Sequence, residues 1–393
     1  MDNFFPTNPI ELYLVGIQKG EQRIDVKKMV ESVAIYESVR ANSLSATLTI
    51  RDGLDILSSM PIEGGESVFL EWKMSGKDVS NKNEFIVYKI SGQTYDYDAG
   101  VQMYTLNMTT KDKIIDVGLN IQKAYSGTCS EIVNAVISNK INSSKSVQTT
   151  DSVGTSTFHP ANRTPLEFCS WLAKRAIAVD YSPFYFFETR NGYVFSDYGN
   201  LSKQPYKYEY TYNPFLSVGK QINPDAIEDH YFNIQAISIL DSQDRLSQTY
   251  NGVFEEVFHT FDVAKKKATD VTFVGNNIKP KLNTETPNDP FRGKRNKHKF
   301  MLTRKDGSDK AIPTKNAVEN LLMENRINVE VIGNDDIFAG DVIRINIPSV
   351  EPRHDGINYS PALSGNYMVH DIAHIFNGTT YVTQMTLVKD SRG

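Results

Sequence analysis

The sequence predicts an α+β fold that is mainly β, with two related β domains around a small α/β lobe and an inserted segment. Three observations support this prediction. A strand–turn–strand pattern occurs twice, once in each half of the chain. The sequence contains 20 Tyr and 20 Phe, and aromatic residues favour strands. Two helix-start motifs lie close together between the two copies of the pattern.

The repeated pattern is a turn of glycine and an acidic residue, then an alternating strand, then a strand pair. Ile62–Trp72 aligns without a gap with Ile337–Ile347. In this alignment Gly65 is equivalent to Gly340, and Glu66 to Asp341. Beyond it, Phe85–Val87 is equivalent to Tyr367–Val369, and Lys111–Asp112 to Lys389–Asp390. Such a repeat indicates two related domains in one chain. Chance similarity between two unrelated meanders is the alternative.

The composition limits the possible functions. A chain of 393 residues can hold two or three domains, each with its own core. The net charge of −5 argues against bulk nucleic-acid binding. Cys129 and Cys169 lie 40 residues apart, without metal-ligand spacing, which fits a reduced cytoplasmic environment. No apolar run is long enough to span a bilayer, and the N-terminus lacks the pattern of a signal peptide.

The first β domain is expected over residues 1–112. Strand patterns cover Ile10–Leu14, Lys28–Tyr36 and Ser43–Arg51. In the last of these, apolar residues alternate with serine and threonine, which is typical of a strand with one buried face. A short helical turn is expected within Asp52–Met60, and the first copy of the repeated pattern then completes the domain.

Residues 113–206 are expected to form the α/β lobe. Two capping boxes predict its helices, since a threonine and a glutamate in each satisfy free amides at a helix start. They are Thr128–Glu131, for a helix near 128–141, and Thr164–Glu167, for a helix near 164–177. A β-hairpin is predicted over 184–197, because Asn191-Gly192 suits the two positive φ angles of a type I′ turn.

The second β domain is expected to be discontinuous. Residues 207–262 and 326–393 would form it, separated by an insertion at 263–325 that holds a basic arm and a helix. The stretch Asn276–Pro313 is polar and broken by prolines, so we expect it to project and to become ordered only against a neighbouring protein.

The basic arm is the candidate partner interface. It consists of Arg292, Lys294, Arg295, Lys297 and Lys299. These side chains could hold phosphates, but apart from Phe291 and Phe300 the arm has no aromatic platform for bases. A solvated or partner-binding arm is therefore the favoured interpretation.

His370 and His374 raise the question of a metal site, because His-Asp-Ile-Ala-His resembles the H-E-x-x-H motif of zinc proteases. That motif requires a helix, in which residues four apart lie within roughly 6 Å. The flanking residues favour a strand, which would separate the two histidines by about 13 Å. We therefore expect no metal here, and histidines hydrogen-bonded at an interface instead.

Motifs of common enzyme classes are missing from the sequence. It contains no G-x-S-x-G elbow, no Walker loop and no G-x-G-x-x-G. Carboxylates are plentiful, but the sequence cannot place a pair of them across a cleft. We therefore expect no catalytic residues, no cofactor and no enzymatic activity.

The chain resembles the baseplate central hub proteins of contractile-tailed bacteriophages, a family that includes the N-terminal hub part of type VI secretion spike proteins. The resemblance lies in the helix Thr164–Ala173 with the hairpin after it, and in the ending Ala339–Ile343 with Ser364–Asp390. The third similar feature is the arrangement of two β units around an α/β lobe. These features span nearly the whole chain.

The resemblance implies two tail-tube-like β-barrel domains and a homotrimeric ring without catalysis of its own. Such a ring has pseudo-six-fold symmetry, seats the central spike protein below, and seats the tail tube or a tube-initiator protein above. DNA would only pass through its channel, and no membrane insertion is implied. The arm at 276–313 has no counterpart in the family and is a candidate contact for baseplate wedge proteins.

The implied location is the virion tail baseplate, assembled in the bacterial host cytoplasm. The sequence ends three residues after Lys389-Asp390, so we expect a hub with a separate spike rather than a fused one. Two alternatives stay open. One is a cell-wall-degrading or metal-dependent hydrolase associated with a phage tail, and the other is an unrelated β-rich binding module.

Overall fold

The computed structural model describes residues 10–74, 80–213, 231–242, 245–250, 253, 255–274, 281–283, 298–349, 359–378 and 380–391. Strands account for 48% and helices for 20%, which confirms the predicted α+β, mainly β class. Within these residues, no helix is both long and apolar enough to cross a membrane.

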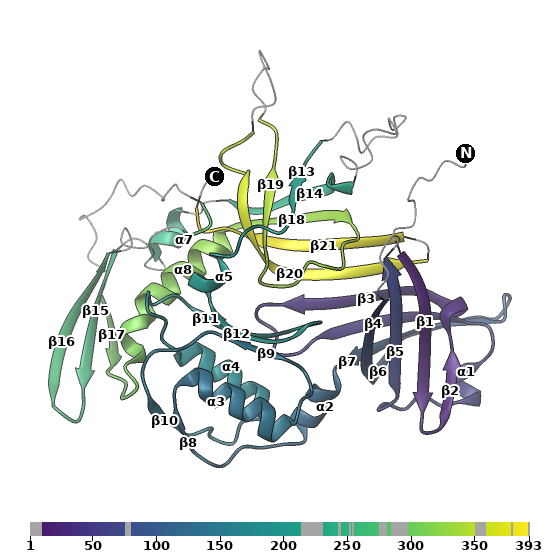
Figure 1. Ribbon diagram of the computed structural model, residues 1–393, viewed down its shortest axis with the longest axis horizontal. Helices are drawn as coiled ribbons and strands as arrows, with labels where there is room; N and C mark the ends of the chain where they lie inside the picture. Colours follow the sequence, from purple (N-terminus) through teal and green to yellow (C-terminus); the bar gives the residue numbers. More distant parts are fainter. Residues whose placement is uncertain are drawn as a thin grey trace.

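Two β regions flank the lobe in the chain (Figure 1). The first contains β1 Ile10–Lys19, β2 Gln22–Asp25, η1 Lys27–Met29, β3 Val30–Ser38, β4 Ser45–Asp52, α1 Ile56–Ser59, β5 Ser67–Met74, β6 Ser80–Asp96 and β7 Val101–Thr109. The second contains β13 Glu209–Thr211, β14 Ile234–Ser242, β18 Asn325–Ile332, β19 Val342–Asn346, β20 Gly365–Asn377 and β21 Thr380–Val388.

The remaining elements form the lobe and the inserted part of the chain. The lobe has α2 Lys111–Val117, β8 Tyr125–Gly127, α3 Cys129–Val136, η2 Ile137–Ile141, β9 Val147–Thr149, β10 Ser156–Phe158, α4 Pro165–Arg175, β11 Phe184–Thr189, β12 Gly192–Asp197 and α5 Tyr198–Leu201. The inserted part has α7 Arg245–Tyr250, β15 Glu255–Asp262, β16 Lys267–Val274, β17 His298–Leu302, η5 Ser308–Ala311 and α8 Ile312–Glu324.

The strand order of the first β region recurs in the second. Neighbouring strands follow the order β3-β4-β7-β6-β5 in one and β14-β18-β21-β20-β19 in the other. The register is also the same, because Val68 pairs with Phe85 where Ile343 pairs with Tyr367. Five equivalent strands in one order and one register support the duplication inferred from the sequence.

Irregularities of the strands recur as well. The β3–β4 register shifts between Val30 and Ser32, and the β14–β18 register shifts at the equivalent place, between Ile234 and Ala236. The β6–β7 and β20–β21 registers shift at equivalent places too, at Tyr88 and His370. Among the five equivalent strands, one further shift occurs in each region alone, between Ser91 and Thr94 of β6–β7 and between Ile239 and Asp241 of β14–β18. Because a bulge displaces every later side chain, the shared bulges keep the same buried face in both domains up to these points.

The glycine–acid turn has one structure in both regions. Glu66 accepts a hydrogen bond from the amide of Glu63 at 3.0 Å, and Asp341 accepts one from the amide of Phe338 at 2.8 Å. The preceding Gly65 and Gly340 have φ angles of +98° and +89°, which other residues rarely adopt. The sequence motif is therefore a turn that the acidic side chain closes.

The two regions differ at their outer strand and at the end of the repeat. β1 runs antiparallel to β5, whereas the short β13 runs parallel to β19. Thr109 is equivalent to Val388, so Lys389-Asp390 corresponds to Thr110-Lys111. The predicted alignment of Lys389-Asp390 with Lys111-Asp112 was wrong by one residue. The Lys-Asp pair occurs in both copies, but it starts two residues after Thr109 and only one residue after Val388.

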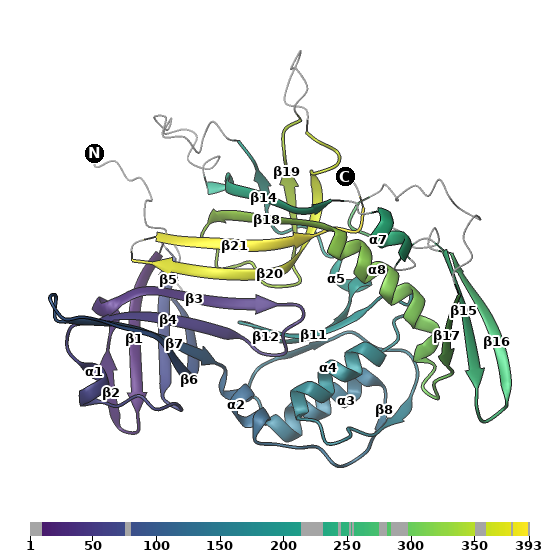
Figure 2. The same ribbon diagram turned by 180° about the vertical axis from the view of Figure 1, so that it is seen from behind.

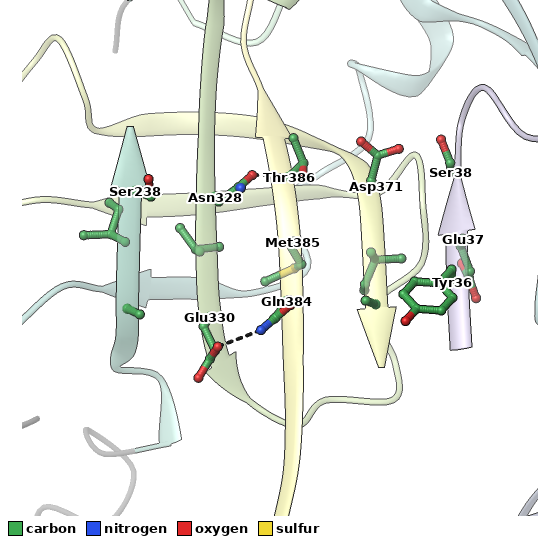
Figure 3. A pocket seen from close by; sticks show the side chains of 15 residues that line it. Tyr36, Glu37, Ser38, Ser238, Asn328, Glu330, Asp371, Gln384, Met385 and Thr386 are labelled. Carbon is green, nitrogen blue, oxygen red and sulfur yellow. Dashed lines mark hydrogen bonds between the residues drawn. The ribbon is translucent and has the colours of Figure 1, made fainter. Parts of the chain in front are cut away.

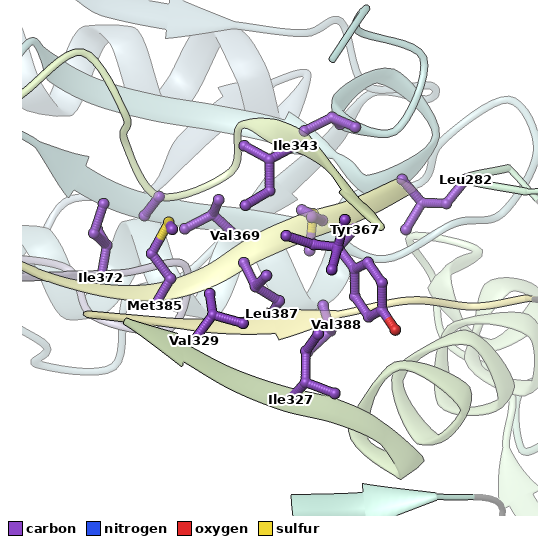
Figure 4. Close-up of a cluster of buried hydrophobic side chains, with 14 of the residues drawn as sticks. Leu282, Ile327, Val329, Ile343, Tyr367, Val369, Ile372, Met385, Leu387 and Val388 are labelled. Carbon is purple, nitrogen blue, oxygen red and sulfur yellow. The ribbon is translucent and has the colours of Figure 1, made fainter. Parts of the chain in front are cut away.

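Each β region has its own core on one face of the sheet. The core of the second region lies between its sheet, α8, α5 and the β11–β12 hairpin (Figure 4). The core of the first region also includes Phe376 and Tyr381, which belong to the second. A third core fills the lobe, between α3, α4 and the strands beside them.

The lobe follows most of the sequence predictions. Thr128 and Thr164 both form complete capping boxes, and the hairpin spans β11 and β12. The predicted type I′ turn was wrong, because the two loop residues are Arg190 and Asn191 and neither has a positive φ. Gly192 instead lies in the strand, where a Cβ atom would come within 2.4 Å of the carbonyl of Ser146.

The inserted part is more ordered than predicted. β15 pairs with β16 and β17 in a separate three-stranded sheet, although residues up to 262 were expected in the second β domain. Leu282 is buried in the core of the second region, and β17 and η5 also lie within Asn276–Pro313. That stretch therefore does not project as a whole, because an apolar residue anchors it.

Phe376→Ala should reduce stability by about 3–5 kcal/mol, because the ring is buried in the core of the other β region and leaves a cavity. Urea denaturation followed by tryptophan fluorescence would measure the loss. Tyr36→Ala, at a residue that is 40% exposed, is the matched control and should change stability by less than about 1 kcal/mol. Equal effects of the two changes would contradict this packing.

Candidate functional site: the junction between the two β regions

The two β regions join edge to edge through β3 and β20. β20 pairs with β19 over its first residues and with β3 from Asp371 to Asn377. The pairing is antiparallel, with His374 opposite Ile35 and Phe376 opposite Val33. One continuous sheet therefore crosses from one region to the other (Figure 2).

A buried ion pair fixes this junction to the lobe. Glu37 of β3 accepts a hydrogen bond from Arg190 Nε at 2.8 Å and another from the Ala339 amide at 3.1 Å. Arg190 also donates to the carbonyl of Ile337 at 2.9 Å, and its guanidinium lies over the Phe338 ring. The Glu37 and Arg190 side chains are 0% and 5% exposed. One pair thus holds the first region, the lobe hairpin and the second region together.

Glu188 makes a second link between the lobe and the first region. Its carboxylate accepts hydrogen bonds from the Leu44 amide at 2.9 Å and from the Thr110 hydroxyl at 3.0 Å. Burial raises the pKa of Glu188, although the ion pair with Lys145 opposes the shift. The lobe is therefore attached through two buried carboxylates.

His374 lies inside the junction and is fully buried. Its Nδ1 is 2.7 Å from the hydroxyl of Tyr381. Burial lowers the pKa of His374 well below its ordinary value of 6.5, and the charge of Arg190 lowers it further. The imidazole is therefore neutral near pH 7.

The other face of the joined sheet is polar and forms a shallow groove across the junction (Figure 3). Gln384 donates to Glu330 at 2.9 Å, and Thr386 donates to Asn328 at 3.0 Å. The first region repeats such ladders, with Thr49 and Thr105 hydroxyls 3.0 Å apart. Amide, hydroxyl and carboxylate groups thus satisfy one another across neighbouring strands of this face.

Only Lys299 of the predicted basic arm lies within the described residues. Arg292, Lys294, Arg295 and Lys297 fall outside them. Lys299 is in β17, 2.9 Å from the buried carboxylate of Glu256, and its amine lies over the Phe258 ring. Its charge therefore has a partner within the chain.

His370 and His374 lie in one strand, β20, as predicted. His370 is at the bulge, with Nδ1 2.8 Å from Asp371, so the two histidines have different partners. No group of three His, Cys, Asp or Glu side chains that could hold a metal occurs among the described residues. The expectation that the histidines bind no metal stays a prediction.

The junction residues Glu37, Arg190 and Glu188 were missed by the sequence reasoning. One signal for Glu37 was available, because it follows Val33 and Ile35 on the buried face of an alternating strand. A glutamate at such a position needs a buried partner. The sequence does not identify that partner, which lies 153 residues away.

Comparisons with known proteins agree with this architecture. No family model matches the sequence. A sequence named "Probable baseplate hub protein gp334", from Vibrio phage KVP40, is 20% identical over 426 residues, which cover 98% of this chain and 96% of that protein. The chain is similar to a phage baseplate hub protein over nearly its whole length. The predicted resemblance to such proteins is confirmed.

Solved structures of tail proteins share the fold. The 43 kDa tail protein of prophage MuSo2 from Shewanella oneidensis has a TM-score of 0.57 and 13% identity, with 97% of this chain and 98% of that chain covered. The tail protein from Neisseria meningitidis MC58 has a TM-score of 0.56 and 13% identity, with 96% of each chain covered.

Arg190→Met should reduce stability by about 3–5 kcal/mol, because it leaves the Glu37 carboxylate buried without its cation. The double variant Glu37→Gln/Arg190→Met should recover part of this loss, since the Gln oxygen still accepts a hydrogen bond and carries no charge. Chemical denaturation of both single variants and the double variant would measure the coupling. Strictly additive losses would contradict a structural ion pair.

The stability of the protein should fall as the pH drops below 6.5, because the buried His374 resists protonation and the unfolded chain does not. Its contribution is complete above the unfolded pKa and is lost towards the lower folded pKa, by up to about 1.4 kcal/mol per pH unit. Denaturation between pH 7.5 and about 5 should give a flatter pH profile for His374→Gln than for the wild type. An unchanged slope would refute this assignment.

Proposed function

We propose that the protein is the structural hub of a phage tail baseplate, a homotrimeric ring that joins the central spike protein to the tail tube. The observation that carries the proposal is the duplicated β region joined to its copy edge to edge within one chain. The sequence likeness to a baseplate hub protein supports it.

The ends of the joined sheet suggest how the ring closes. β14 is the counterpart of β3, and it lies at the end of the sheet with β18 as its partner among the described strands. Repetition of the β3–β20 pairing between chains would use this edge. Closure of a ring satisfies such edges, which otherwise invite aggregation. Three chains would then present six similar tube-like β domains in one barrel.

This symmetry would match two different neighbours. Six similar domains suit a six-subunit tail tube or a tube-initiator protein above the ring. The true three-fold axis suits a trimeric spike below it. Duplication within the chain would thereby adapt one symmetry to the other.

The polar face of the sheet is the candidate lining of the channel. Helices and the lobe occupy the opposite face, as the buried cluster around α8 and the hairpin demonstrates. Side chains paired in ladders, with the carboxylates of Glu330 and Asp371 among them, would let DNA pass without binding it strongly. β17, which belongs to the arm at 276–313, lies on the far side of α8 from the junction, where baseplate wedge proteins could contact it (Figure 1).

Mass photometry of the purified protein tests the ring. The expected particle has three times the 44.3 kDa mass of one chain. Electron-microscopy class averages of that particle should have three-fold symmetry and a central channel. A protein that is monomeric or dimeric at every concentration, or a trimer without a channel, would contradict the proposal. Peptidoglycan assays should detect no hydrolysis, and activity would favour the hydrolase alternative.

A further inference from the structure

The junction inside the chain provides a template for the contact between chains. Tyr95 pairs with Gln102 where Phe376 pairs with Tyr381, so Tyr95 is the counterpart of Phe376. In the same way Thr94 is the counterpart of Ile375, because Thr94 pairs with Met103 as Ile375 pairs with Val382. The last three residues of β6, Thr94 to Asp96, are therefore equivalent to residues of β20 that pair with β3.

The two counterparts differ sharply in exposure. Phe376 is 1% exposed, with its ring 5.4 Å from Trp72 in the core of the first region. Tyr95 is 56% exposed, although it has the same place in the register. Its ring stacks on Tyr97, and Gln93 donates to its hydroxyl at 2.8 Å. The tyrosine is thus held in place at the sheet edge without a core to enter.

β14 likewise exposes a residue whose counterpart in β3 is buried. Ile35 of β3 pairs with Ala46, and Ile239 of β14 pairs with Ile327, the counterpart of Ala46. Ile35 is fully buried in the junction, whereas Ile239 is 49% exposed. Leu240 beside it is 43% exposed and is the extra residue of a register shift that β3 lacks. Exposed apolar residues along a sheet edge, one of them equivalent to a residue that is buried elsewhere in the same chain, are typical of an interface.

We propose that the β6 edge of one chain docks onto the β14 edge of a second copy, in the register that β20 and β3 use within the chain. This inference rests on the proposed ring and assigns its contacts. Thr94 lies opposite the partner's Ser238, and Tyr95 lies opposite the partner's Ile237. Tyr95 then enters the core of the partner's second region, as Phe376 enters the core of the first.

The contact between chains is also weaker than the junction within the chain. The position equivalent to Glu37 is Ser242, which carries no carboxylate to bind an arginine. The lobe hairpin with Arg190 occurs once per chain, so it clamps the internal junction alone. The junctions between chains therefore depend on backbone pairing and apolar burial.

Cysteine cross-linking tests the register. Thr94→Cys/Ser238→Cys places two thiols at directly opposed positions, where the Cα separation suits a disulfide. Both native cysteines are buried and should not compete. Mild oxidation should give covalent trimers on a denaturing gel. The control Asp96→Cys/Ser238→Cys shifts one thiol by two residues and should give almost none.

Substitution tests the apolar contact. Tyr95→Asp and Ile239→Asp should each weaken trimer formation by about 30-fold or more, as expected for the loss of an interface hot spot. Val179→Asp is the matched control, because Val179 is 87% exposed on the lobe, away from both edges. The circular dichroism spectrum should be unchanged in all three variants, since none of these side chains lies in a core of its own chain.

The outcomes separate the two proposals. A wild-type trimer that persists in both aspartate variants, and that gives no Thr94–Ser238 cross-link, would overturn this contact and leave the hub function intact. A wild type that neither associates nor cross-links at any concentration would overturn the ring and the contact with it. Cross-linking of the control pair in preference to the test pair would mean that the β6 and β14 edges pair in a different register.

Discussion

The buried ion pair between Glu37 and Arg190 is the constraint on which the arrangement of the whole chain depends. It reaches a strand of the first β region, the hairpin of the lobe and the turn that opens the second region's repeat. Burying a charged side chain without its counter-ion costs free energy. The folded chain is therefore most stable when Glu37 and Arg190 are paired. A displaced lobe would leave both charges unpaired, and the internal junction therefore has one geometry.

The duplication is conserved where it controls the buried face of each sheet and has diverged at the edges. Two shared bulges and the shared glycine–acid turn keep the cores of the five strands in the same register in both regions. The outer strands differ, since β1 is long and antiparallel and β13 is short and parallel. Domains that share a core pattern but not their edges can contact different neighbours.

The likeness to hub and tail proteins gives this divergence a functional context. The sequence likeness covers nearly all of the chain and of its relative, and the solved tail proteins share the fold. One face of the joined sheet carries side chains paired across strands, and helices and the lobe cover the opposite face.

Local signals in the sequence determined much of the fold. The capping boxes, the alternating strands, the glycine–acid turns and the strand around His370 and His374 all depend on residues within a few positions of one another. Tertiary structure alone decided the pairing of β3 with β20, the partner of Glu37 and the anchoring of Leu282. It also decided that the hairpin turns at Arg190-Asn191, because the carbonyl of Ser146 lies against Gly192. The reason is physical: a short motif restricts its own backbone angles, whereas an edge strand or a buried charge can be satisfied by any suitable group, and only the folded chain selects which one.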